Sequence, residues 1–93
     1  SFVVGGDAVA DPDTLVEALS ALIATHDVLR VKGMVAVAGK PMRLVVQAVG
    51  PRIQHFFDRP WQPQEARRTQ LVVIGQKGLD RAAIEADIQA VLG

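Results

Sequence analysis

Residues 30–50, RVKGMVAVAGKPMRLVVQAVG, decide the fold of this 93-residue chain. Apolar and polar residues alternate on both sides of residues 39–41 (GKP), which is typical of two β-strands joined by a turn. The pattern predicts one strand over residues 28–38 and a second over residues 42–49. The GKP segment lacks the glycine spacing and the hydroxyl of a phosphate-binding loop. We therefore interpret it as the hairpin turn.

The side chains of these two strands divide between two faces, because successive residues of a strand point in opposite directions. The residues expected to face a core are Leu29, Val31, Val35, Val37, Met42, Leu44, Val46 and Ala48. The opposite face would carry Arg30, Lys32, Arg43 and Gln47, and would be polar and partly cationic. Either water or another domain or protein could cover that face, and both alternatives stay open.

Two amphipathic helices are predicted, one before and one after these strands in the sequence. The first begins at Asp11-Pro12, since aspartate caps free amides and proline is favoured at the first helical position. The second begins at Asp80. Apolar residues follow each start at helical spacing, namely Leu15, Leu19, Leu22 and Ile23 in the first helix and Ile84, Ile88, Val91 and Leu92 in the second.

Shorter apolar runs predict further strands over residues 1–4, 52–57 and 71–75, while residues 58–66 contain two prolines and are expected to form a loop. The resulting element order is β-α-β-β-β-β-α. It predicts an α+β fold, with a roughly five-stranded, mostly antiparallel sheet and two amphipathic helices packed on one face.

Composition limits the classes of function. Ten basic residues balance ten acidic ones, which argues against a general affinity for nucleic acid or anionic membranes. The absence of cysteine suits a cytoplasmic protein, and no run of about 20 apolar residues could span a bilayer. We expect a single domain over residues 1–93. Because the chain begins at Ser1, we expect a fragment of a longer protein, with N-terminal processing as the alternative.

Catalytic and metal-binding patterns are weak. The two histidines suggest pairs, His26 with Asp27 and His55 with Asp58, but a metal site needs three or four convergent ligands. No serine lies in a nucleophile motif. The sequence therefore predicts no catalytic, cofactor-binding or metal-binding residue in this chain.

Arginines and aromatic residues gather in residues 52–68, where Trp61, Arg67 and Arg68 stand out. Three interpretations stay open: aromatic side chains at the edge of the core with solvated arginines, a protein interface, or stacking on single-stranded nucleic acid. The neutral net charge disfavours nucleic acid. The candidate partner-contact residues are Arg30, Lys32, Arg43, Gln47, Trp61, Arg67 and Arg68.

Several of these segments occur together in one family. Arg30-x-Lys32-Gly33, Gln47-x-x-Gly50, Trp61 and the run from Arg67 to residues 71–75 (LVVIG) have the order and spacing of the C-terminal domain of CobW-type P-loop GTPases. The resemblance covers nearly the whole chain. Within this family, the sequence of residues 39–52 resembles that of the members that act in the cobalamin pathway.

The resemblance implies a parent protein with an N-terminal GTPase domain, which would use GTP and Mg²⁺ and deliver a divalent metal such as cobalt or zinc. The recipient would be a cobaltochelatase in cobalamin synthesis. This chain would be a non-catalytic accessory domain that packs on the GTPase domain or recruits the recipient. None of the family's catalytic or metal residues matches a position here. The alternative is a stand-alone domain that binds a small ligand or a metal.

Overall fold

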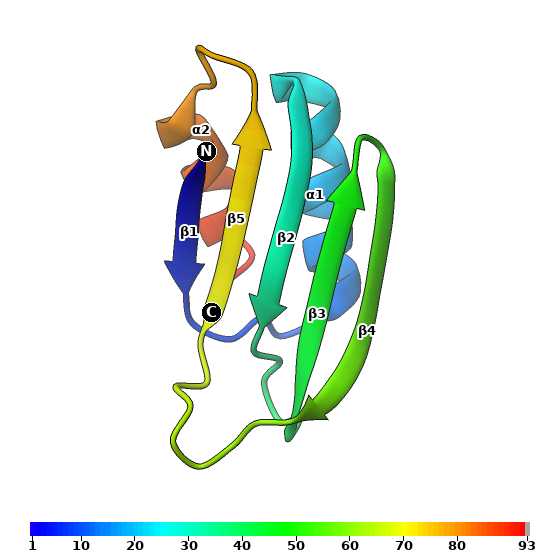
Figure 1. Ribbon diagram of the computed structural model, residues 1–93, viewed down its shortest axis with the longest axis vertical. Coiled ribbons are helices and arrows are strands. Elements are labelled where there is room, and N and C mark those ends of the chain that lie inside the picture. The colour runs from blue at the N-terminus through cyan, green and yellow to red at the C-terminus, as the bar shows by residue number, and fades with distance from the viewer. Residues whose placement is uncertain (93) are drawn as a thin grey trace.

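A computed structural model describes residues 1–92 as a five-stranded sheet with two helices (Figure 1). The elements are β1 (Phe2–Gly6), α1 (Pro12–His26), β2 (Val28–Val35), β3 (Met42–Val49), β4 (Arg52–Pro60), β5 (Thr69–Gly75) and α2 (Arg81–Gln89). The strands lie in the order β1-β5-β2-β3-β4, and every neighbouring pair is antiparallel. The predicted α+β class and the element order are confirmed.

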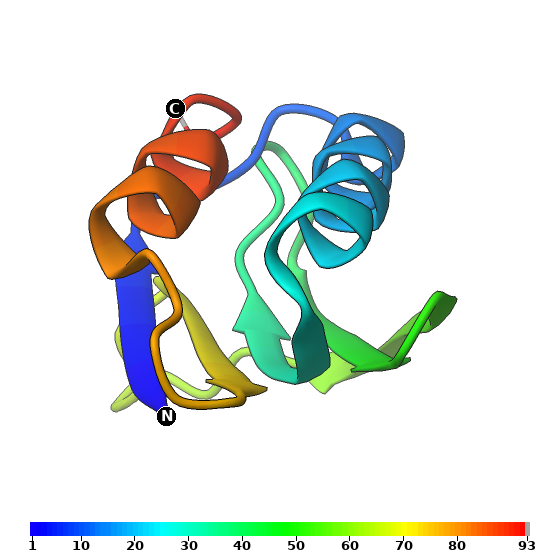
Figure 2. The same ribbon diagram turned by 90° about the horizontal axis from the view of Figure 1, so that it is seen from above.

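Both helices lie on the same face of the sheet (Figure 2). The hydrophobic core fills the space between the helices and this face, because the apolar stripes of the helices and the inward residues of the strands meet there. The largest fully buried side chains are Leu15, Leu19, Leu22, Leu44, Leu71, Ile84, Ile88, Val4, Val9, Val31, Val35 and Val46.

The predicted helix starts are confirmed. A carboxylate oxygen of Asp11 accepts a hydrogen bond from the amide of Asp13 at 3.0 Å, and Asp80 accepts one from the amide of Ala83 at 3.1 Å. The assignment of Val91 and Leu92 to the second helix is wrong. α2 stops at Gln89, and Val91 and Leu92 pack against the core from the turn that follows.

The prediction that Leu29 faces the core is also wrong, since its side chain is 51% exposed. A register shift between Val28 and Arg30, where β2 pairs with β5, breaks the strict alternation, and Val28 takes the buried position instead. β2 ends at Val35, earlier than predicted. Val37 still reaches the core, because its segment forms a short bridge with Val9.

The fourth strand is longer than predicted and lies at the edge of the sheet. β4 continues to Pro60, so residues 58–60 belong to it and not to the following loop. Asp58 is an extra residue in the pairing with β3, between the partners of Arg43 and Leu44. The bulge accommodates the extra residue, so that β4 continues to pair with β3 beyond Phe57, where the predicted strand ended.

Thr69 is the one buried polar residue among residues 1–92. Its hydroxyl donates to the carbonyl oxygen of Asp7 at 2.9 Å and accepts from the amide of Ala36 at 3.3 Å. The side chain therefore joins the start of β5 to the segment before α1 and to the segment after β2. A buried hydroxyl with both partners in place stabilises these connections.

Replacing Thr69 by valine keeps the shape of the side chain and removes both hydrogen bonds. We expect Thr69→Val to lower the free energy of unfolding by about 1–3 kcal/mol, because the buried amide of Ala36 and the partly buried carbonyl of Asp7 lose their partner. Urea denaturation measures this. Thr25→Val is the matched control: its hydroxyl donates to Ala21 on an exposed helix surface, and its loss should cost less than about 0.5 kcal/mol. Equal effects at both positions would contradict the role of Thr69.

Gly33 lies on β2 opposite Leu71 of β5. A Cβ atom at this position would stand 2.0 Å from the carbonyl oxygen of Gln70 and 2.9 Å from the Cα of Leu71, which are backbone atoms. We expect Gly33→Ala to cost about 3 kcal/mol or more in unfolding free energy, since the two strands must separate. Gly5→Ala, whose Cβ would meet nothing nearer than 3.7 Å, should be nearly neutral in the same denaturation experiment.

Candidate functional site

The sheet face opposite the helices is the main candidate for function. We call it the uncovered face, because neither helix packs on it (Figure 2). It is built from the outward side chains of all five strands. These are Val3, Arg30, Lys32, Met34, Arg43, Val45, Gln47, Val49, Arg52, Gln54, Phe56, Gln70, Val72 and Ile74, as the alternation of buried and exposed residues and the strand registers show.

Four of the predicted contact residues, Arg30, Lys32, Arg43 and Gln47, share this face as expected. The registers place apolar residues among them: Arg30 lies between Val49 and Ile74, and Lys32 lies between Gln47 and Val72. The expectation of a simply polar face therefore needs correction.

Large apolar side chains stand exposed on the uncovered face. Val3 is 52% exposed, Val49 is 61% exposed and Phe56 is 48% exposed. A hollow of about 390 Å³ opens in the middle of the face, and Val3, Lys32 and Val72 are among its lining residues. Exposed apolar groups next to cations are typical of a surface that binds another protein.

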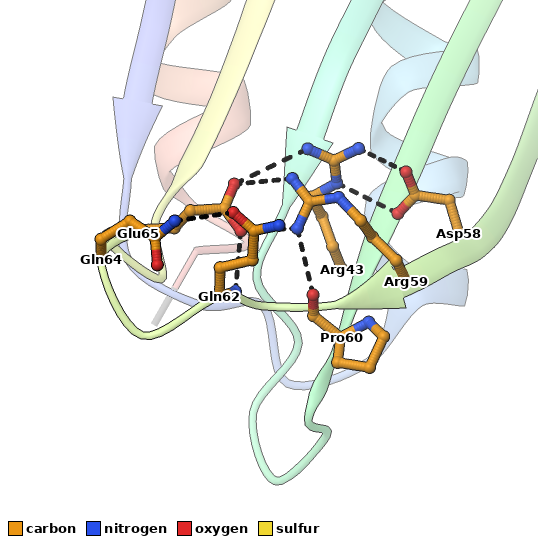
Figure 3. Close-up of polar contacts among 7 residues, drawn as sticks. All are labelled: Arg43, Asp58, Arg59, Pro60, Gln62, Gln64 and Glu65. Carbon is orange, nitrogen blue, oxygen red and sulfur yellow. Dashed lines mark hydrogen bonds and ion pairs between the residues drawn. The ribbon is translucent and has the colours of Figure 1, made fainter.

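Arg43 differs from the other predicted residues because it is already paired (Figure 3). Its Nε donates to Asp58 Oδ1 at 3.0 Å, and a second nitrogen contacts the other oxygen of the same carboxylate. This hydrogen bonding raises the pKa of Arg43 and lowers the pKa of Asp58. Asp58 is the bulge residue of β4, so the bulge positions the carboxylate for this pair. Arg43 contributes mainly to the local structure.

Glu65 fastens the loop between β4 and β5 (Figure 3). Its carboxylate accepts from Arg59 Nη1 at 2.6 Å and Nη2 at 2.8 Å, and from the amide of Gln62 at 2.8 Å. Arg43 Nη1 lies 3.9 Å away. The bonds from Arg59, and then the bond from Gln62, lower the pKa of Glu65 to about 2. One carboxylate thus ties the loop to β3 and β4.

The other predicted residues, Trp61, Arg67 and Arg68, lie on this fastened loop. The amide of Trp61 donates to the carbonyl of Pro41 at 3.1 Å, which holds the loop against the β2–β3 turn. Trp61 and Arg67 line a hollow of about 460 Å³ together with Lys40, and Arg68 lines another of about 330 Å³. Because Met34 and Gln70 belong to both the smaller hollow and the uncovered face, the two regions adjoin.

The aromatic residues of β4 do not fill the edge of the core, which corrects one of the interpretations of residues 52–68. Phe56 and Phe57 are 48% and 41% exposed and lie on opposite faces of the strand, whereas Trp61 is partly buried. Val3 and Val49 were missed as contact residues. The alternation in their strands could have indicated them, since each stands next to a buried residue.

The histidines lie apart. His55 is on β4, and His26 Nε2 lies 3.7 Å from Asp87 Oδ2 across the two helices. Within residues 1–92, no three side chains of histidine, aspartate or glutamate gather into a possible metal site. No helix in the same range is long and apolar enough to cross a bilayer. What the described geometry offers is binding, through apolar side chains and cations on one surface.

Glu65 predicts a pH dependence of stability. Its pKa in the folded chain, about 2, is below the ordinary value of 4.5, so its contribution is complete above pH 4.5 and is lost as the pH falls toward 2. We expect Glu65→Gln to flatten the loss of stability between these pH values. Urea denaturation at several pH values measures this, with Glu17→Gln on α1 as the control. Equal acid sensitivity of both variants and the unmodified chain would contradict the role of Glu65.

Known proteins match this chain along its whole length. The family model described as "Cobalamin synthesis protein cobW C-terminal domain" matches residues 1–92. A zinc chaperone CobW from Sinorhizobium sp is 51% identical over 92 residues, and one from Pseudomonas aeruginosa is 55% identical over 78 residues. These matches cover 99% and 84% of this chain but only 26% and 20% of the relatives.

Solved structures agree with the sequence match. The Zn(II)-bound YjiA GTPase from E. coli superposes with a TM-score of 0.77 at 26% identity, and a Zn(II)-bound triple mutant of that GTPase superposes with a TM-score of 0.78. Each superposition covers 99% of this chain and 29% of the solved chain. With the family model matching residues 1–92, this chain belongs to the CobW C-terminal domain family.

Proposed function

We propose that this chain is a non-catalytic accessory domain of a CobW-type GTPase, and that its uncovered face docks onto the GTPase domain of the same protein. The observation that carries the proposal is the exposure of Val3, Val49 and Phe56 beside Arg30 and Lys32 on one sheet face. The parent protein would bind GTP and Mg²⁺ in the other domain and carry a divalent metal.

The composition of the face supports docking. Burying an exposed valine or phenylalanine side chain completely stabilises a complex by roughly 1.5–3 kcal/mol before the costs of association. Within residues 1–92, Arg30 and Lys32 make no ion pair, so carboxylates of a partner could complement them. The hollow of about 390 Å³ would receive an apolar side chain of that partner.

The lengths of the relatives support the choice of partner. The curated relatives and the YjiA GTPase extend well beyond the matched segment, which makes up 20–29% of them. A domain from the remaining part of such a chain is present at high effective concentration beside this one. We therefore expect an interface within one protein, formed with the GTPase domain.

Zinc is the metal we propose for the parent protein, because both curated relatives are named zinc chaperones. Cobalt, with a cobaltochelatase as the recipient, remains the alternative that the resemblance to cobalamin-pathway members predicts. Titration of the complete parent protein with Zn²⁺ and with Co²⁺ separates the two. The cytoplasmic location expected from the composition stays a prediction.

The docking proposal is tested by calorimetric titration of this chain into the separately produced GTPase domain of its parent. We expect binding, and we expect the double variant Arg30→Glu, Lys32→Glu to bind roughly tenfold or more weakly, because reversed charges repel the complementary partner. Lys77→Glu, a charge reversal of another exposed lysine in the loop after β5, is the control and should bind normally. No binding, or equal losses for both variants, would overturn the proposal.

A further inference from the structure

β4 is an edge strand with unusually little protection. It pairs with β3 on one side only and lies at the rim of the helix layer (Figures 1 and 2). Residues 54–57 are exposed, while Ile53 packs against the core. Edge strands normally carry lysine, proline or a bulge that prevents pairing with other chains. In β4 the bulge at Asp58 and the proline at position 60 protect one end, and residues 52–57 (RIQHFF) contain neither device.

We propose that β4 pairs with β4 of a second copy of this chain, antiparallel, about a twofold axis that passes through His55. Residues 52–57 of the two copies would then continue the sheet from one molecule into the other. In this register His55 lies opposite His55 of the second copy. Each residue before His55 lies opposite the residue equally far after it.

The side chains of β4 favour this register. A twofold axis perpendicular to a sheet keeps each face continuous, so inward residues meet inward residues. On the face toward the helices, Phe57 would lie opposite Ile53 of the second copy. On the uncovered face, Gln54 would lie opposite Phe56 of the second copy. The register therefore matches apolar side chains on the face toward the helices, and it places no apolar side chain opposite an arginine.

Shifted registers lose these matches. A twofold axis at Gln54 would place Phe56 opposite Arg52, and an axis at Phe56 would place Ile53 opposite Arg59. Both pair an apolar residue with a cation. The zero formal net charge of the chain removes long-range repulsion between copies.

The expected dimer is weak and reversible. It is formed by one strand from each copy, which buries less than the standard interface of about 1,600 Å². Neither Phe56 nor Phe57 belongs to the hydrophobic core. Substitutions at these positions therefore test association without removing core packing.

Cysteine cross-linking tests the register, since the chain contains no cysteine of its own. Under mild oxidation, His55→Cys should form a disulfide-linked dimer fastest. Gln54→Cys and Phe56→Cys should couple more slowly, because each cysteine meets its own copy only diagonally, at about 7–8 Å. Val3→Cys, an exposed residue on the opposite edge strand β1, is the control for random coupling. Equal rates at all four positions would overturn the proposal.

Sedimentation equilibrium of the unmodified chain provides a second, independent measurement. We expect the average mass to rise with concentration toward that of a dimer. Phe57→Lys should shift this rise to higher concentration by roughly tenfold or more, because it places a charge opposite Ile53. Val3→Lys, a similarly exposed valine on β1, should leave it unchanged. A chain that stays monomeric at its highest soluble concentration would also overturn the proposal, whatever the outcome of the GTPase-domain titration.

Discussion

The rest of this fold depends on one constraint: only two helices are present to cover the sheet. Two helices, of 15 and 9 residues, must cover a sheet of five strands, and both pack on the same face. The hydrophobic core therefore lies on one side only. The opposite face stays open, and β4 extends beyond the helix layer. The uncovered face and the unprotected edge strand both result from this arrangement, and each is a surface at which we propose binding.

Two polar side chains hold the connections between the elements, in different environments. Thr69 is fully buried and uses a neutral hydroxyl with one donor and one acceptor partner. Glu65 lies near the surface and uses a charge shared among Arg59, the amide of Gln62 and, more distantly, Arg43. The two hydrogen bonds of Thr69 contribute to stability because they are shielded from water. The contacts of Glu65 contribute because its carboxylate is charged. As a result, pH acts on the loop through Glu65 and leaves the Thr69 contacts unaffected.

Local patterns in the sequence correctly predicted those features that depend on residues close together in the chain. Asp11 and Asp80 cap helices through amides two or three residues away, and the alternation of β3 survives in the structure. Long-range pairing decided the rest. The exposure of Leu29 depends on how β2 meets β5, and Arg43 is held by Asp58, fifteen residues later. Similarly, Arg30 and Lys32 were placed on the correct face, but their apolar neighbours Ile74 and Val72 come from β5, whose position between β1 and β2 no local pattern specified.

The placement of Trp61 gives the chain a spectroscopic probe of one region. It is the only tryptophan, and there is no tyrosine. Its ring lies between the β2–β3 turn and the loop that Glu65 fastens, and its indole nitrogen is shielded from solvent without an acceptor among residues 1–92. Emission from this ring reports on the end of the sheet where that loop docks. Far-ultraviolet circular dichroism reports on the helices and strands as a whole. Recording the two signals together distinguishes release of the loop from unfolding of the domain.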